Sequence, residues 1–159
     1  NPSNLFMSNE VVSSSNKILV TSNNNFFIID ENTGSILSKF SFSSLVKPII
    51  NENYVFLITK NNFLILLNLN INKILYSSDI DDQISNFLDI KKEKSIIKSF
   101  MLVNNEIFVF LKNSYVLSFQ SSGTIKSVKK LPARLNSIPI IIDKLIYFLN
   151  NKNKLVVLS

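Results

Sequence analysis

Two short charged stretches are the parts of this sequence whose residue types could carry binding or catalysis. The first is the basic run from Lys129 to Arg134, which reads Lys-Lys-Leu-Pro-Ala-Arg and holds the only arginine of the chain. A planar guanidinium binds a carboxylate through two parallel hydrogen bonds, and arginine is over-represented at protein interfaces. We therefore treat Lys129, Lys130 and Arg134 as candidate partner-binding residues, against the plainer interpretation of a linker between repeats.

The second stretch is acidic and contains Asp79, Asp81 and Asp82. Three carboxylates suggest calcium, but a calcium loop of the EF-hand type needs Gly at its sixth position and Glu at its twelfth. Counted from Asp79, those positions hold Ile84 and Ile90. The pattern instead favours a solvated acidic loop or the N-terminus of a helix. Asp81 and Asp82 remain weaker candidates for contact with a partner.

The composition argues against catalysis and bound cofactors. Among its 159 residues the chain has no Cys and no His, which excludes thiol nucleophiles, imidazole bases and nearly all zinc or copper sites. Its two glycines are too few for a glycine-rich phosphate loop. We expect no catalytic residues, no cofactor and no metal ion.

The formal net charge of +6 is unevenly distributed. Residues 1–80 are neutral overall, and residues 81–159 carry the whole excess of positive charge. A basic half can attract nucleic acid, anionic lipid or an acidic protein. The lysines are spread over predicted turns, so we favour a solvated surface and expect no nucleic-acid partner. No apolar run approaches the length of a membrane-spanning helix, about 18 residues or more. No leader is evident either, so we expect any signal peptide to have been removed or to lie outside this chain.

Strands are the elements that would position these residues. In residues 17–40, apolar runs rich in Ile, Val and Phe alternate with Asn and Gly turns, which predicts strands at Lys17–Ser22, Phe26–Asp30 and Ser35–Phe40. Gly34 takes without steric cost the left-handed conformation that a tight hairpin needs. The pattern recurs in four units, at about 9–44, 45–80, 96–130 and 135–159.

The period can be measured between the last polar residues of the third strands, which are Asp30, Asn68, Gln120 and Ser159. The spacings are 38, 52 and 39 residues, so the middle one contains an insertion of about 13 residues. This insertion matches the charged stretch at about 81–95. Ile84, Phe87 and Leu88 have helical spacing there, which predicts a short helix or a long loop.

A four-stranded repeat of about 40 residues has the length of a β-propeller blade. The runs Tyr54–Ile58 and Phe63–Leu67 are apolar without alternation, which indicates strands buried on both faces, as in a blade between two neighbours. An ordinary β-sandwich or barrel would show alternation and no fixed period. We predict an all-β chain, a β-propeller fragment of roughly four four-stranded antiparallel blades with one irregular insertion, forming a single partial domain over residues 1–159.

The turn after Phe26–Asp30 adds a family resemblance. Ile28-Ile29-Asp30 followed by Thr33-Gly34 resembles the repeat of quinoprotein-type (PQQ-like) propellers, in which an Ala-Leu-Asp type triplet precedes a Thr-Gly turn and a Trp in the fourth strand. Ser38 and Tyr76 stand at the Trp position in the first and second units. Within that superfamily, the segments 46–51, 53–59 and 62–68 resemble the BamB family, which are lipoproteins of the outer-membrane β-barrel assembly machinery.

This resemblance implies a non-enzymatic periplasmic scaffold, peripheral to the outer membrane, that contacts a β-barrel assembly factor and assists assembly and insertion of outer-membrane β-barrel proteins. Two alternatives stay open: a quinoprotein dehydrogenase that uses pyrroloquinoline quinone and calcium, and a propeller that binds carbohydrate or peptide. Members of the family have eight blades, so this chain would be part of a propeller. Its end blades would expose apolar faces with strands such as Phe63–Leu67, and we expect the isolated chain to be marginally stable or to self-associate.

Overall fold

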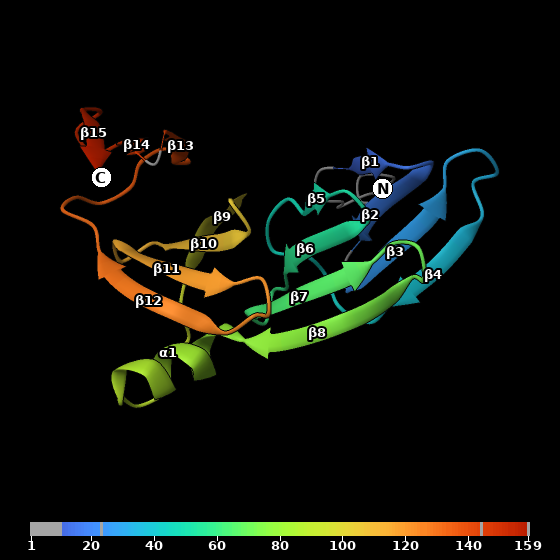
Figure 1. Cartoon of the computed structure of the whole chain (residues 1–159), viewed down its shortest axis with the longest axis horizontal. Coiled ribbons are helices and arrows are strands. Elements are labelled where there is room, and N and C mark those ends of the chain that lie inside the picture. The colour runs from blue at the N-terminus through green and yellow to red at the C-terminus, as the bar shows by residue number, and fades with distance from the viewer. Residues whose placement is uncertain (1–10, 23, 144, 159) are drawn as a thin grey trace, which may run out of the picture. The chain divides into compact units, whose positions relative to one another are not determined.

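The computed structural model describes residues 11–22, 24–143 and 145–158, and these residues form antiparallel sheets and one helix. Within each sheet the strands lie side by side in chain order, as a meander (Figure 1). The first sheet contains β1 (Val12–Ser14), β2 (Lys17–Ser22), β3 (Asn25–Asp30) and β4 (Ile36–Phe40). The second contains β5 (Ile49–Asn51), β6 (Tyr54–Ile58), β7 (Phe63–Asn68) and β8 (Lys73–Asp79).

The helix α1 (Ile80–Leu88) follows the second sheet directly. The third sheet contains β9 (Ile97–Val103), β10 (Glu106–Leu111), β11 (Tyr115–Gln120) and β12 (Ile125–Lys130). The fourth contains β13 (Ile140–Ile142), β14 (Leu145–Leu149) and β15 (Leu155–Leu158). Three predicted units are thus four-stranded, and the fourth has three strands among the described residues. The predicted unit ends at residues 9 and 159 lie outside the described residues.

The chain forms two compact units, with the boundary between Ile80 and Asp81. The first and second sheets belong to unit 1, and the third and fourth belong to unit 2. This boundary coincides with the change in net charge along the sequence. The sequence of unit 1 is neutral, and that of unit 2 carries a formal charge of +6. The interpretation of residues 1–159 as one domain stays a prediction.

The first three sheets share the same strand ends and the same irregularity in strand pairing. Asp30, Asn68 and Gln120 end β3, β7 and β11, as the measured period predicted. In these three sheets the third and fourth strands pair across a register shift of the kind that a β-bulge produces. The pairs next to the shift are Ile28 with Ser38, Leu66 with Tyr76, and Ser118 with Ser127. Ser38 and Tyr76 therefore occupy equivalent positions, as the alignment of the repeats predicted.

The carboxylate of Asp30 holds the turn after β3. Its Oδ1 accepts hydrogen bonds from the backbone N–H of Thr33 at 2.8 Å, from the Thr33 hydroxyl at 2.9 Å and from the backbone N–H of Asn32 at 3.0 Å. Gly34 follows with φ 69°, and Asn72 in the second sheet has φ 50°, as predicted for these turns. The bonds from Thr33, with a smaller effect from Asn32, hold the pKa of the Asp30 carboxyl below its ordinary value.

This turn predicts a pH dependence. A carboxyl with a lowered folded pKa stabilises the fold above its unfolded pKa, about 3.9 for Asp, and that contribution is lost as the pH falls through the folded pKa. In Asp30→Asn the amide oxygen can still accept the hydrogen bonds of the turn, but the side chain no longer gains or loses a proton. We expect the drop in the free energy of unfolding between pH 7 and pH 3, measured by urea denaturation, to be smaller in the variant. An equal drop in both proteins would contradict the role assigned to Asp30.

In unit 1 the first and second sheets pack against each other. Phe26, Ile28 and Leu19 from the first sheet share one buried cluster with residues of the second, which are Val55, Leu57, Ile65, Leu67 and Leu69. The residues of β6 and β7 after the first of each strand are buried, apart from the last one, Asn68. Burial on both faces, predicted from their non-alternating sequence, is confirmed.

In unit 2 the fourth sheet packs on the third through one face. Phe148 of β14 is 2% exposed and lies in a cluster with Phe110 and Val116 of the third sheet and with Leu131 and Leu135 of the connection. Ile146, Val156 and Leu158 pack against this cluster from the fourth sheet. Because neighbouring strand residues point to opposite faces, the other side chains of the fourth sheet form a second face.

That second face corrects an expectation. Phe63–Leu67 was expected on an exposed outer face, but Leu64 to Leu67 are buried. The uncovered apolar face belongs to the fourth sheet, where Ile140 is 54% and Val157 47% exposed. These two residues both pair with Tyr147, so they share one face.

We expect this face to make the 159-residue chain self-associate. At about 25 cal/mol per Å², covering several hundred Å² of apolar surface contributes on the order of 10 kcal/mol. Ile140→Lys combined with Val157→Lys should shift the chain toward monomer in sedimentation velocity. Ile71→Lys is the control, because Ile71 is 56% exposed in a turn of unit 1. A monomeric unmodified chain would show that the face does not drive association.

Candidate functional site

The predicted insertion contains the helix α1, which begins with acidic residues. Asp81 and Asp82 lie in its first turn, where carboxylates interact favourably with the positive end of the helix dipole. The helix ends at Leu88, the next residue Asp89 has φ 52°, and Ile90 N–H donates to the Ser85 carbonyl at 3.1 Å. The Ser85 hydroxyl donates to the Ile90 carbonyl at 2.8 Å. The interpretation of these acids as a helix N-terminus is thus confirmed.

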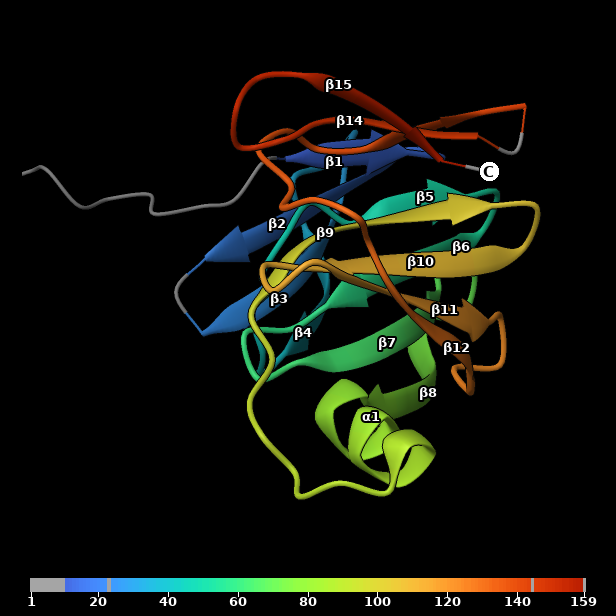
Figure 2. The same ribbon diagram turned by 90° about the vertical axis from the view of Figure 1, so that its left-hand side faces the viewer.

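After α1 the chain runs through a long irregular segment before it enters β9 (Figure 2). Asp81 is 6% exposed, and its Oδ1 accepts a hydrogen bond from the backbone N–H of Ser95 at 2.9 Å. Asp82 forms an ion pair with Lys92 at 2.7 Å. These two contacts hold the returning segment 89–96 against the start of the helix.

Gln83 fastens the helix to the third sheet. Its Oε1 accepts a hydrogen bond from the backbone N–H of Ile125, the first residue of β12, at 3.2 Å. On β11, Val116 points toward the fourth sheet, whereas the next residue, Leu117, lines the cavity described below. The insertion therefore lies against one end of the face of the third sheet that is turned away from the fourth.

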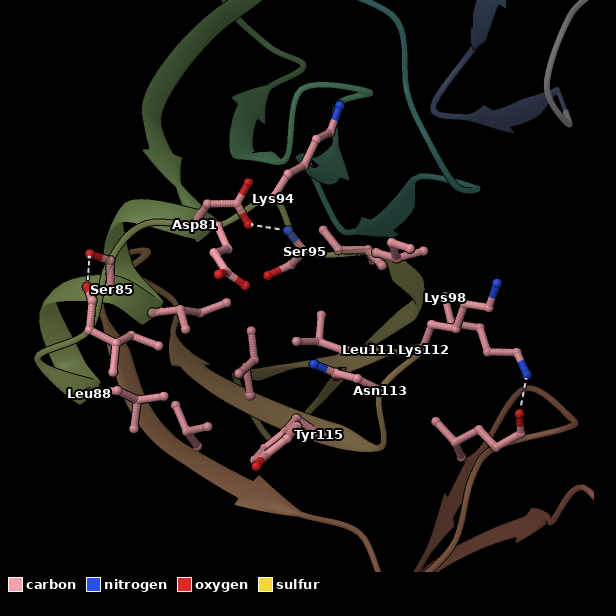
Figure 3. A pocket seen from close by; sticks show the side chains of 18 of the residues that line it. Asp81, Ser85, Leu88, Lys94, Ser95, Lys98, Leu111, Lys112, Asn113 and Tyr115 are labelled. Atoms are coloured by element: carbon pink, nitrogen blue, oxygen red, sulfur yellow. Dashed lines mark hydrogen bonds between the residues drawn. The ribbon is translucent and has the colours of Figure 1, made fainter.

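A cavity of about 750 Å³ lies between the insertion and this face, and we call it the insertion cavity. Its apolar lining comes from the helix, the returning segment, the third sheet and the connection to the fourth. These side chains are Ile84, Leu88, Ile90, Ile96, Ile97, Leu111, Leu117, Val128 and Leu135, with the ring of Tyr115. Figure 3 shows Leu88 and Tyr115 among these lining side chains.

The charged lining is mostly positive. Five cationic side chains, Lys91, Lys94, Lys98, Lys112 and Arg134, are opposed by two carboxylates, Asp81 and Glu93. The ammonium of Lys98 donates to the Leu135 carbonyl, and Lys112 N–H donates to the Ile96 carbonyl at 2.8 Å. In Figure 3, Lys98, Lys112 and Asn113 lie on one side of the cavity, and Lys94 extends away from it. Such a lining can attract and hold an anion.

The structure brings only some of the predicted site residues together. Arg134 and Asp81 both line the insertion cavity, although they were singled out in separate stretches. Lys129 and Lys130 are not part of the linker, because β12 extends to Lys130, and both are exposed outside the cavity lining. Asp82 pairs with Lys92 on the surface of the insertion.

Sequence reasoning missed the turn between β10 and β11. Lys112 and Asn113 of this turn line the cavity together with Tyr115 at the start of β11. Asn113 and its neighbours resemble the other polar turns of the repeat, so no local sequence signal distinguishes this turn from the others. Only the position of the insertion over this end of the sheet identifies them.

The lining suits binding more than bond-making chemistry. It consists of aliphatic side chains, cations, amides, a phenol, two serines and two carboxylates, of which Asp81 is already hydrogen-bonded to Ser95. Among the described residues, no group of three or more Asp and Glu is placed to hold a metal ion. Asp30 and Tyr76, whose pKa values are shifted, lie in unit 1 and do not line this cavity. Burial raises the pKa of Tyr76 to about 12. No helix within the described residues is long and apolar enough to span a membrane.

Comparison with solved structures identifies the fold. The crystal structure of BamB from Moraxella catarrhalis superposes with a TM-score of 0.70 at 13% sequence identity, over 94% of this chain. The computationally designed protein Ika8 gives 0.69 at 11% identity over 94% of this chain, and the designed Ika4 gives 0.70 at 10% over 99%. The fold is that of a β-propeller. The prediction of an all-β propeller fragment is confirmed.

These likenesses extend to the fold alone, because all three identities are low. No family model matches the chain, and no curated protein sequence matches it. This chain spans 42% of the BamB structure and 45% of Ika8, which is less than half of each, but 93% of Ika4. The PQQ-like repeat therefore stays a resemblance.

Proposed function

We propose that this chain is part of a non-enzymatic scaffold resembling BamB, which works in the periplasm at the outer membrane. In this proposal it assists the assembly and insertion of outer-membrane β-barrel proteins by binding a protein of the assembly machinery. The likeness in fold to BamB supports the proposal, together with the resemblance of segments 46–51, 53–59 and 62–68 in the sequence.

The observation that carries the proposal is the surface of the insertion. Phe87 is 48%, Ile90 53% and Ile96 63% exposed, although Asp81 holds the returning segment to the helix and Gln83 holds the helix to the third sheet. Exposed apolar side chains on a well-anchored segment are typical of a protein-binding surface.

Arg134 lies at the border of this surface. It is exposed and lines the insertion cavity beside Leu135. Lys129 and Lys130 lie at the exposed end of the neighbouring strand β12. An arginine next to apolar side chains can pair with a partner carboxylate while its stem covers apolar surface, as in many interface hot spots. We therefore assign the partner interface to the insertion and Arg134, with Lys129 and Lys130 at its edge.

Arg134→Glu tests this assignment. Reversing an interface arginine leaves a partner carboxylate facing a like charge, so binding to the β-barrel assembly factor should weaken by more than about 1 kcal/mol. The dissociation constant is measured by biolayer interferometry with the assembly factor immobilised. The far-UV circular dichroism spectrum should stay that of the unmodified chain, because Arg134 is exposed.

Lys73→Glu is the matched control, since Lys73 is an exposed cation on β8 of unit 1. It should bind the assembly factor like the unmodified chain. If neither Arg134→Glu nor Phe87→Asp changes the affinity, the interface does not lie on the insertion. If the unmodified chain does not bind the assembly factor at all, the scaffold proposal itself is wrong.

A further inference from the structure

We propose that the insertion cavity is a binding site for a small amphipathic anion, which is a molecule with an apolar chain and a carboxylate or phosphate head. This site goes beyond the scaffold role and does not depend on it. The proposal rests on the lining of the cavity. We call the part lined by Ile84, Leu88, Tyr115 and Leu117 its apolar end, and the part lined by Lys98, Lys112 and Arg134, with Leu111 and Leu135 beside them in the chain, its cationic end.

The apolar end lies between α1 and β11. Ile84 and Leu88 are four residues apart, so they lie on the same side of the helix, and both line the cavity together with Tyr115 and Leu117. Leu88 is nevertheless 41% exposed, which shows that the helix does not close onto the sheet. An apolar chain in this gap would remove the exposed surface from water without moving either element.

The cationic end lies at the connection to the fourth sheet. Lys98 donates a hydrogen bond to the Leu135 carbonyl, and Arg134, the residue before Leu135 in the chain, lines the cavity together with Lys112 and Asn113. Arg134 and Lys112 are exposed, so both side chains are free to turn toward a head group. A guanidinium binds a carboxylate or a phosphate through two hydrogen bonds, and the Asn113 amide can donate a third.

Size and charge restrict the ligand. The volume of about 750 Å³ lies within the range of small-molecule sites, about 300–1,000 Å³. Lys91, Lys98, Lys112 and Arg134 outnumber the two carboxylates of the lining, and one of these, that of Asp81, accepts a hydrogen bond from Ser95. A neutral chain would leave the cationic end without a partner, and an amphipathic cation would be repelled by it. The lining therefore selects an anion.

Isothermal titration of the 159-residue chain tests the ligand class, with decanoate, decyl phosphate and decyltrimethylammonium as probes below their micelle concentrations. We expect one molecule of decanoate or decyl phosphate to bind per chain, at least about tenfold more tightly than decyltrimethylammonium. The first two probes distinguish a fatty-acid head from a phosphate head. Equal affinity for all three, or no saturable binding of either anion, would overturn the proposal.

Two pairs of variants place the ligand in this cavity. Leu88→Trp fills the apolar end and should abolish binding of the anionic probe. Phe87→Trp should leave it unchanged, because Phe87 is similarly exposed but does not line the cavity. Arg134→Gln together with Lys112→Gln should weaken binding about tenfold, as expected for lost hydrogen bonds to a charged group. Lys73→Gln should not.

The circular dichroism spectrum of each variant reports whether it folds. The probe binds elsewhere if its binding survives Leu88→Trp. It also binds elsewhere if Lys73→Gln weakens binding as much as the Arg134 and Lys112 changes do. These titrations contain no protein partner. Their outcome is therefore independent of whether the assembly factor binds.

Discussion

Replacing Phe26 with Ala is expected to lower the free energy of unfolding by about 3–5 kcal/mol, the usual range for a buried phenylalanine. Phe26 is fully buried where the first and second sheets pack against each other. Its ring centroid lies 5.8 Å from that of Phe42 and 6.3 Å from that of Phe40. The variant therefore loses aromatic contacts on one side and aliphatic contacts with the second sheet on the other.

Phe27→Ala is the matched control on the same strand. Phe27 points to the opposite face of the first sheet, is only half-buried, and has the Lys39 ammonium 5.8 Å from its ring centroid. We expect this variant to lose about 1–2 kcal/mol, because less apolar surface is uncovered. Urea denaturation followed by circular dichroism gives both values. Equal losses of unfolding free energy would mean that the two faces of the first sheet contribute equally to stability. That result would contradict the core described above, in which only the face with Phe26 is fully buried.

The sheets could be predicted from the sequence because their signals are local. Asn and Gly at the turns permit positive φ, and the non-alternating runs at β6 and β7 report burial on both faces. The period fixed the strand ends at Asp30, Asn68 and Gln120. The repeated register shift before the fourth strand was not predicted. It depends on how two strands pair, and no single residue type marks it.

The insertion cavity could be predicted only in part. Charge and rarity drew attention to Asp81 and Arg134, but nothing in the sequence indicates that they line one cavity, because a whole sheet separates them along the chain. The roles of Lys112 and Asn113 depend on the helix covering one end of the third sheet. Tertiary placement of this kind cannot be read from the local sequence pattern. The exposed apolar face is a second example, because it was expected at Phe63–Leu67 and lies instead on the fourth sheet.

Replacing Phe148 with Ala is expected to open the fourth sheet locally. This sheet has three strands among the described residues, and its buried contacts are on the one face that carries Phe148. Losing a buried phenylalanine costs about 3–5 kcal/mol, and small sheets have little stability of their own. Backbone amides of β14 and β15 should exchange with deuterium at least about a hundredfold faster, since each 1.4 kcal/mol is a factor of about ten.

Amides of β7 in unit 1 should keep their exchange rates in Phe148→Ala, because the core of unit 1 shares no residue with the cluster around Phe148. Tyr147→Ala is the control within β14, since Tyr147 lies on the opposite, more exposed face with Ile140 and Val157. It should change the exchange of β15 much less. Equal acceleration of β7 and β15 in Phe148→Ala would contradict local opening. The chain would then unfold as one cooperative body, as the single-domain prediction over residues 1–159 requires.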